Sequence, residues 1–232
     1  MRDTPDAVML FAAGFGTRMG DLTRTRPKPL LPVAGRCLLD HALDLTAAAG
    51  ARRRVVNTHY LGEQVADHLA DRPDVQISHE TPEVLDTGGG LRQALPLLGS
   101  GPVFTLNTDA VWTGRNPLET LRSAWRPEDM DGLLLLVPAE RARGHAGHGD
   151  FLSDANGRIQ RGPGAVYTGA QILRTEMLSE IRESAFSLNV VWDRMLAQGR
   201  LFGTVHSGGW CDVGRPDSIP LAEAMLAEAA DA

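Results

Sequence analysis

The regular alternation of short apolar segments with helical patterns constrains the fold of this 232-residue chain more than any other feature. Apolar segments typical of strands lie at 7–13, 54–57, 75–79, 103–106 and 132–137, with helical patterns between them at 38–49, 63–69, 90–98 and 117–125. Strands that alternate with helices indicate βαβ units and a mostly parallel sheet. We therefore expect a ligand cleft beyond the carboxyl ends of the strands.

The second half of the chain is less regular but continues the same pattern. An Asn156-Gly157 pair stands between two short apolar segments, which favours a β-hairpin. Further strands are expected at 165–173, 201–206 and 209–214, and further helices at 188–198 and 217–230. Because no linker or internal repeat divides the chain, we expect a single α/β domain over residues 1–232.

Composition excludes several classes of protein. Hydrophobic residues make up 43% of the chain and charged residues 22%, as in ordinary globular proteins, and the formal net charge of −6 argues against a nucleic-acid partner. The two cysteines, Cys37 and Cys211, are far apart and match no metal-ligand spacing. Residues 1–8 are too polar for a secretion signal, and no apolar run reaches the roughly 20 residues of a membrane span. We expect a cytoplasmic protein without a membrane partner.

A glycine-containing loop follows the first expected strand. Gly14 and Gly16 allow backbone N–H groups to approach an anion closely. The third glycine of a dinucleotide-binding fingerprint is replaced by Met19, which disfavours a dehydrogenase. The loop also carries four basic residues and two prolines that stiffen it: Arg18, Arg24, Arg26, Lys28, Pro27 and Pro29. A phosphate-binding loop is one interpretation; a tight turn or a solvated basic loop are the alternatives.

Two aspartates stand at strand ends. Asp109 directly follows the fourth expected strand, and Asp212 comes 103 residues later in the segment 209–214. Either could simply cap a turn. Mg²⁺ prefers one or two carboxylates together with phosphate oxygens, so the two aspartates and the basic loop together predict a magnesium site.

Residues 11–35, "FAAGFGTRMGDLTRTRPKPLLPVAG", resemble the signature of sugar-1-phosphate nucleotidyltransferases. That family joins a nucleoside triphosphate to a sugar 1-phosphate and releases pyrophosphate, on a Rossmann-like three-layer sandwich with a mostly parallel mixed sheet. The resemblance implies Mg²⁺ on Asp109 and Asp212, although Thr108 replaces the usual glycine before Asp109. It also implies catalytic roles for Arg18 and Lys28, and a nucleotide wrapped by Ala12, Ala13, Gly14, Gly16, Thr17 and Arg18.

The resemblance also implies pockets for the base and the sugar. The segment 79–95, "HETPEVLDTGGGLRQAL", would read the base with Gly88 at a free helix N-terminus. Glu83 is our assignment for the base, although Glu80 is an equal candidate by position. The residues expected to contact the sugar 1-phosphate are Asn107, Asp150, Thr168, Gly169 and Asn189. Asn189 could equally belong to a plain surface helix.

The loop "RARGHAGHGDF" at 141–151 is similar to a loop of bacterial N-acetylmuramate-1-phosphate uridylyltransferases. This favours UTP and N-acetylmuramate 1-phosphate as substrates. Mannose-1-phosphate guanylyltransferases, which use GTP, share most of the motifs and are the alternative. A zinc pair at His145 and His148 is disfavoured, because the run is rich in glycine and has few partner ligands. A non-catalytic nucleotide-binding protein would not need Lys28 and both aspartates. Both monomer and homodimer are compatible with the sequence.

Overall fold

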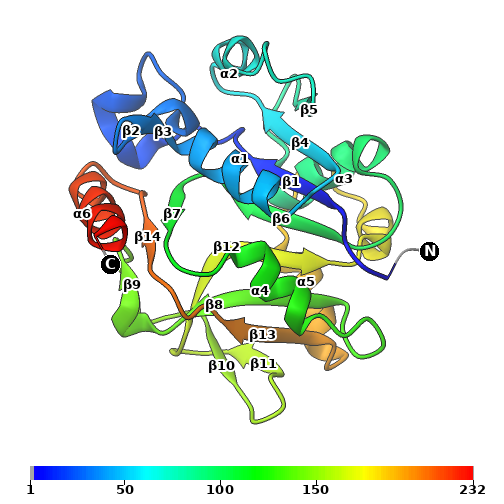
Figure 1. Ribbon diagram of the computed structural model, residues 1–232. Helices are drawn as coiled ribbons and strands as arrows, with labels where there is room; N and C mark the ends of the chain where they lie inside the picture. Colours follow the sequence, from blue (N-terminus) through cyan, green and yellow to red (C-terminus); the bar gives the residue numbers. More distant parts are fainter. Residues whose placement is uncertain (1–2, 232) are drawn as a thin grey trace.

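The computed structural model describes residues 3–231, and its main feature is a seven-stranded sheet in the order β13-β8-β12-β6-β1-β4-β5 (Figure 1). All strands of the sheet run parallel except β12, which is antiparallel to both of its neighbours. Their bounds are β1 Ala7–Phe11, β4 Arg53–Thr58, β5 Val75–His79, β6 Val103–Asn107, β8 Gly132–Val137, β12 Val166–Leu173 and β13 Leu201–Val205. The predicted mostly parallel, mixed sheet is confirmed.

Helices cover both faces of this sheet. One face packs against α1 (Leu38–Ala48), α2 (Gly62–His68) and α4 (Pro117–Ala124), through buried side chains such as Val8, Leu43, Val65 and Leu118. The other face packs against α3 (Asp86–Leu98) and α5 (Asn189–Ala197). The alternating inward and outward residues of buried strands explain why every strand of the sheet except the edge strand β5 contributes to both clusters. Within residues 3–231, none of the helices has the length and apolar character needed to cross a bilayer.

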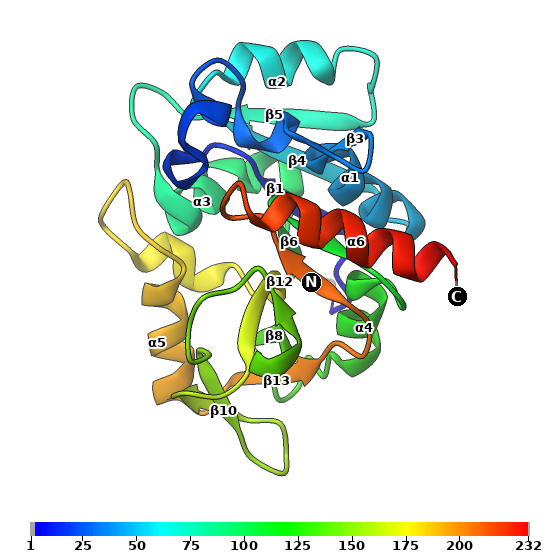
Figure 2. The ribbon, with the colours of Figure 1, turned by 90° about the vertical axis from the view of Figure 1, so that its left-hand side faces the viewer.

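A smaller sheet and two hairpins complete the fold. In the smaller sheet, β14 (Trp210–Asp212) lies between β7 (Ala110–Trp112) and β9 (Ala142–Arg143), and α6 (Ser218–Ala230) packs against it (Figure 2). The hairpins are β2 (Pro32–Val33) with β3 (Arg36–Cys37) and β10 (Phe151–Ser153) with β11 (Ile159–Arg161). The latter is the hairpin predicted from the Asn-Gly pair. Short 3₁₀ segments are η1 Thr17–Thr23, η2 Lys28–Leu30, η3 Ala139–Arg141 and η4 Glu176–Glu180.

Helix α3 begins earlier than the sequence predicts. We expected it to start at Gly90, yet it begins at Asp86, so three glycines lie inside its first turns. Close packing explains them: a Cβ at Gly88 would lie 2.3 Å from the Phe186 ring, and one at Gly89 would lie 2.4 Å from the Ser184 carbonyl oxygen. The contacts made by a helix surface without side chains outweigh the low helix propensity of glycine.

We predict that Gly89→Ala destabilises the protein by about 1–3 kcal/mol, the usual cost of overpacking, because the backbone around Ser184 must move to admit the methyl group. Gly14→Ala is the control, since a Cβ there would meet no atom within 4 Å. Thermal unfolding of the two variants measures the difference. Equal melting temperatures for both would contradict the packing explanation.

Candidate active site

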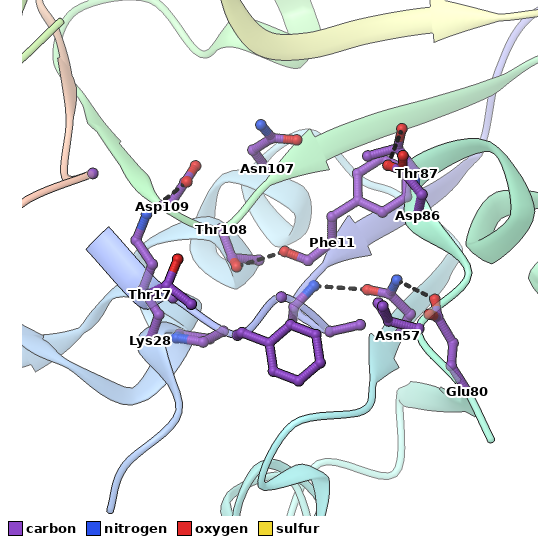
Figure 3. A pocket seen from close by; sticks show the side chains of 18 of the residues that line it. Phe11, Thr17, Lys28, Asn57, Glu80, Asp86, Thr87, Asn107, Thr108 and Asp109 are labelled. Atoms are coloured by element: carbon purple, nitrogen blue, oxygen red, sulfur yellow. Dashed lines mark hydrogen bonds and ion pairs between the residues drawn. The ribbon is translucent and has the colours of Figure 1, made fainter. Parts of the chain in front are cut away.

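A cavity of about 540 Å³ lies beyond the carboxyl ends of β1, β4 and β6 (Figure 3). Phe11, Asn57 and Asn107, at or near the ends of these strands, all line it. The position agrees with the cleft expected for a parallel sheet. Of the residues that the sequence analysis selected as site residues or candidates, the cavity is lined by Ala12, Ala13, Gly14, Gly16, Thr17, Arg18, Lys28, Glu80, Asn107 and Asp109.

The two glycines of the loop after β1 have different environments. Gly16 has φ +64°, and a Cβ there would lie 3.0 Å from side-chain carbons of Thr23 and Lys28, so the fold itself requires glycine. Gly14 has open space around it. Within residues 3–231, the backbone N–H groups of Gly14 and Phe15 have no hydrogen-bond partner. The loop therefore offers backbone donors, next to an open position, to a ligand in the cavity.

A chain of buried hydrogen bonds holds this loop to the neighbouring strands. Asn57 Oδ1 accepts from the Ala12 N–H at 2.7 Å, and Asn57 Nδ2 donates to Glu80 Oε1 at 2.7 Å (Figure 3). Glu80 Oε2 accepts from the Leu85 N–H, also at 2.7 Å. Glu80 is 1% exposed and both of its oxygens are engaged within the protein, so it positions the loop. Glu83 is exposed and does not line the cavity, and its contact with a base stays a prediction.

Thr108 also supports the loop. Its hydroxyl donates to the Phe11 carbonyl oxygen at 2.7 Å, at the point where β1 ends (Figure 3). The threonine that departs from the family's glycine therefore ties β1 to the segment that carries Asp109. Neither this bond nor the Asn57–Glu80 pair was anticipated, because both join residues far apart in the sequence. The sequence could have indicated these bonds only through the polar residues at the ends of β4 and β6, such as Asn57 and Thr108.

The pairing of β7 with β14 explains how Asp109 and Asp212 become neighbours. In this antiparallel pair Asp212 lies opposite Ala110, and the Val213 N–H donates to the Asp109 carbonyl oxygen at 2.8 Å. Lys28 Nζ contacts Asp109 Oδ2 at 2.8 Å, and the Lys28 side chain is 11% exposed. Backbone pairing joins Asp109 to Asp212, and an ion pair joins Asp109 to Lys28. Of the four charged residues predicted for the site, only Arg18 is outside this group.

Asp212 occupies an unfavourable environment for a carboxylate. Burial raises its pKa above the usual value, and the nearby Asp109 carboxylate raises it further. Lys28, Arg18 and His145 oppose this effect without cancelling it. Asp212 is absent from the lining of the cavity, but a Cβ at Gly214, which lines it, would lie 2.8 Å from Asp212 Oδ2. Two neighbouring carboxylates with incomplete charge compensation suit a divalent cation with oxygen ligands.

A second cavity of about 320 Å³ adjoins the first. Phe11, Asp86, Thr87 and Asn107 line both cavities. The second cavity also contains two of the residues predicted for the sugar, Asp150 and Asn189. Asp150 Oδ2 accepts from the Tyr167 N–H at 2.8 Å.

The remaining predicted contacts lie outside both cavities. The Thr168 hydroxyl donates to the Leu135 carbonyl oxygen, and Gly169, at φ +86°, packs against the Asn107 side chain. The N–H groups of Gly88 and Gly89 donate to the Phe186 carbonyl oxygen at 2.8 and 3.1 Å. The expectation that these N–H groups are free is wrong, because the segment before α5 caps the start of α3.

Arg161, which sequence reasoning missed, lines the second cavity. Its guanidinium lies over the rings of Phe151 and Trp192, 5.1 and 5.7 Å from their centroids. Its Nη2 donates to Asn189 Oδ1 at 2.7 Å and to Asp193 Oδ1 at 2.8 Å. The Asp193 side chain is 63% exposed, so this ion pair contributes little to stability. Arg161 therefore supplies a positive charge that two aromatic rings hold in place.

Comparison with known proteins gives consistent results. A model of the MobA-like NTP transferase domain matches residues 8–195. The chain is 40% identical to an N-acetylmuramate alpha-1-phosphate uridylyltransferase from Caulobacter vibrioides, covering 99% of this chain and 100% of that protein. It is 29% identical to the mannose-1-phosphate guanylyltransferase catalytic subunit beta of Drosophila pseudoobscura pseudoobscura, covering 90% of this chain and 59% of that one.

Solved structures agree on the fold. The crystal structure of HddC from Yersinia pseudotuberculosis in complex with GMP-PN superimposes with a TM-score of 0.76. The match covers 95% of this chain and 99% of that chain, at 19% sequence identity. The three-layer arrangement is therefore shared with a protein of very different sequence.

We predict that Asp212→Asn stabilises the ligand-free protein at neutral pH. The raised pKa of Asp212 means that its ionisation costs folding free energy, and the cost appears as pH rises through the folded-state pKa. The advantage of the variant should therefore disappear as the pH is lowered below the ordinary carboxyl range. Thermal unfolding between pH 3 and pH 8 measures it, with Asp44→Asn as the exposed control. A less stable Asp212→Asn at pH 7 would refute this account.

Proposed function

Because the chain belongs to the MobA-like NTP transferase family and is a sugar-1-phosphate nucleotidyltransferase, we propose that it uses UTP and N-acetylmuramate 1-phosphate. The products would be the uridine diphosphate sugar and pyrophosphate. We propose further that residues 1–232 act as one catalytic domain. Membership of an enzyme family removes the alternative of a non-catalytic nucleotide-binding protein. Mannose 1-phosphate and GTP remain the second candidate pair.

The observation that carries the proposal is the convergence of Lys28, Asp109 and Asp212 beside the open loop at Gly14. The reaction is a displacement at the α-phosphorus, in which an oxygen of the sugar phosphate attacks and pyrophosphate leaves. This nucleophile is already an anion, so the site needs no general base. The obstacle is repulsion between two anions, and fixed positive charge and backbone donors reduce it.

Each group of the site has a part in this mechanism. The free N–H groups of the loop would bind phosphate oxygens, and Arg18 and Lys28 would stabilise charge that develops on the departing pyrophosphate. In the structure Lys28 forms an ion pair with Asp109, and the lysine would leave this pair to bind the departing pyrophosphate. Asp109 and Asp212 would hold Mg²⁺, which when bound supplies further positive charge to the phosphates.

The preference for UTP rests on the coverage of the relatives. The Caulobacter uridylyltransferase aligns over its full length, whereas this chain spans about 59% of the Drosophila guanylyltransferase subunit. Glu80 is engaged by Asn57 and the Leu85 N–H, which leaves the exposed Glu83 as the proposed contact to the base.

The preference for N-acetylmuramate rests on Arg161. This sugar carries a carboxylate on its lactyl ether, whereas mannose and N-acetylglucosamine carry none. A guanidinium at the wall of the second cavity suits a carboxylate, which accepts two parallel hydrogen bonds from it. The exposed Asp193 is the protein's own carboxylate at this position, and a substrate carboxylate would replace it at small cost.

The direct test measures pyrophosphate release from UTP, GTP and TTP, with and without Mg²⁺. Each nucleotide is combined with the 1-phosphates of N-acetylmuramate, N-acetylglucosamine and mannose. We expect the highest kcat/KM for UTP with N-acetylmuramate 1-phosphate, and activity that depends on the metal. Asp109→Asn should lower kcat by about 10²–10³, the usual cost of removing one electrostatic contact. Asp44→Asn, which breaks an exposed pair with Arg36, is the control. A clear preference for GTP with mannose 1-phosphate would favour the second candidate.

We predict that Arg161→Gln raises KM for N-acetylmuramate 1-phosphate by roughly tenfold to a hundredfold, the range for losing a hydrogen bond to a charged group. The KM for N-acetylglucosamine 1-phosphate, where that sugar is accepted, should change little because it lacks the carboxylate. Arg158→Gln is the matched control, since Arg158 belongs to the same hairpin but stacks on Phe202 outside both cavities. Equal effects of Arg161→Gln on both sugars would contradict the carboxylate assignment.

A further inference from the structure

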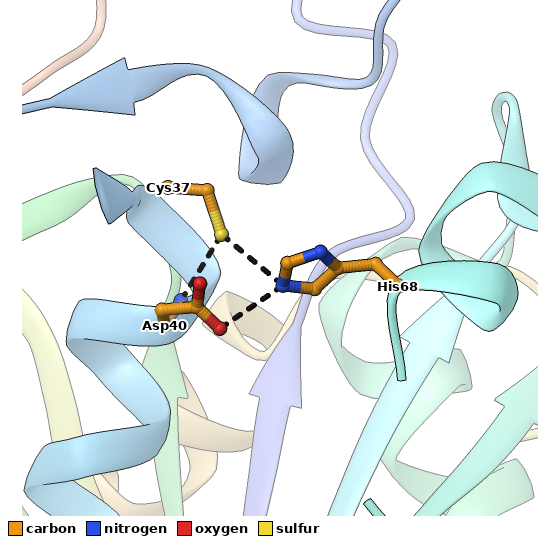
Figure 4. A group of neighbouring side chains, drawn as sticks. All are labelled: Cys37, Asp40 and His68. Carbon is orange, nitrogen blue, oxygen red and sulfur yellow. Dashed lines mark hydrogen bonds and ion pairs between the residues drawn. The ribbon is translucent and has the colours of Figure 1, made fainter. Parts of the chain in front are cut away.

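Three side chains of different chemistry converge between the start of α1 and the end of α2, and none of them lines either cavity. Cys37 Sγ lies 3.4 Å from His68 Nε2, and the same Nε2 lies 3.0 Å from Asp40 Oδ1 (Figure 4). The three donor atoms lie within 4.8 Å of one another. Cys37 and Asp40 come from the junction of β3 and α1, whereas His68 is the last residue of α2.

Hydrogen bonds account for part of this arrangement: the Asp40 N–H donates to Cys37 Sγ at 3.4 Å, where Cys37 caps the start of α1, and His68 Nε2 can donate to Asp40 Oδ1. One imidazole nitrogen can either donate its proton or accept one, yet Nε2 of His68 faces both the Asp40 carboxylate and the Cys37 thiol. A catalytic relay would use the two different nitrogens of the ring, and this geometry uses one nitrogen twice. A cation located between the three atoms would satisfy the sulfur, the nitrogen and the oxygen together.

Two of the three separations between the donor atoms are close to those of a tetrahedral metal site. With Zn–S of about 2.3 Å and Zn–N and Zn–O of about 2.0–2.1 Å, tetrahedral angles separate S from N by roughly 3.5 Å and N from O by roughly 3.3 Å. The observed separations are 3.4 and 3.0 Å. We propose that Cys37, Asp40 and His68 form a binding site for Zn²⁺ or a similar borderline-soft divalent cation, with solvent as the fourth ligand.

The surroundings support this assignment. The side chains of Asp40 and His68 are 18% and 33% exposed, which leaves access for a cation and one water. Arg72 contacts Asp40 Oδ1 at 3.4 Å, a long and partly exposed pair.

The site would connect the start of α1 to the α2 segment, which already supports the basic loop. The Tyr60 hydroxyl donates to the Thr23 carbonyl oxygen, and Gln64 Nε2 donates to the Thr25 carbonyl oxygen. Gln64 and His68 are four residues apart in α2, so they share a face of the helix. A metal on His68 would add a cross-link from α2 to the start of α1. The spacing of the cysteines gave no sign of this, because His68 follows Cys37 by 31 residues.

Cobalt titration of the purified protein tests the proposal. Co²⁺ bound to a thiolate gives an intense near-ultraviolet charge-transfer band, whereas Co²⁺ on the oxygen ligands of Asp109 and Asp212 gives none. We expect the band to saturate at one equivalent of Co²⁺ and to disappear when Zn²⁺ is added, and we expect Zn²⁺ to raise the melting temperature. Absence of the band from the wild-type protein would overturn the proposal.

Variants identify which cysteine binds the metal. Cys37→Ser should abolish the band, and His68→Asn should weaken Co²⁺ binding by more than about tenfold. Cys211→Ala is the control that removes the other thiol and should retain the band. Turnover of Cys37→Ser with Mg²⁺ should be unchanged, which separates this site from the proposed reaction. A band that persists in Cys37→Ser, or that is lost in a folded Cys211→Ala, would refute the assignment.

Discussion

The contact between two short strands, β7 and β14, brings together the two carboxylates of the candidate active site. It places Asp212 opposite Ala110, beside Asp109, although 103 residues separate the two carboxylates. The arrangement is costly for the ligand-free protein, because burial and the proximity of Asp109 both oppose the ionisation of Asp212. Local electrostatic cost of this kind is common where a protein must bind a cation or a reacting anion.

Much of the fold followed from the sequence. Apolar strands alternating with helices predicted the parallel part of the main sheet, and an Asn-Gly pair predicted the hairpin of β10 and β11. These features depend on local preferences, which a sequence displays directly. The first turns of α3 were assigned wrongly because three successive glycines disfavour a helix in isolation. Their contacts with residues 184–186 outweigh that preference, and such contacts exist only after folding.

Only part of the candidate site was predicted, because some of its contacts also exist only after folding. The loop residues, Lys28 and Asp109 were found by their order in the chain and by resemblance, and the structure brings them to one cavity. Asn57 and Glu80 were not recognised as a pair, because their hydrogen bonds depend on the register between β4 and the segment after β5. Arg161 escaped notice because the hairpin that carries it has a turn motif but no motif that indicates a ligand.

The ion pair between Lys28 and Asp109 has a consequence for the order of events in the proposed reaction. The lysine ammonium is a tethered monovalent competitor for the carboxylate that would receive the divalent ion. A bare metal ion must displace it without compensation, whereas a triphosphate that arrives with its metal offers the lysine new anionic partners. The resting enzyme would therefore discriminate against free metal and favour the metal–nucleotide complex as the entering species.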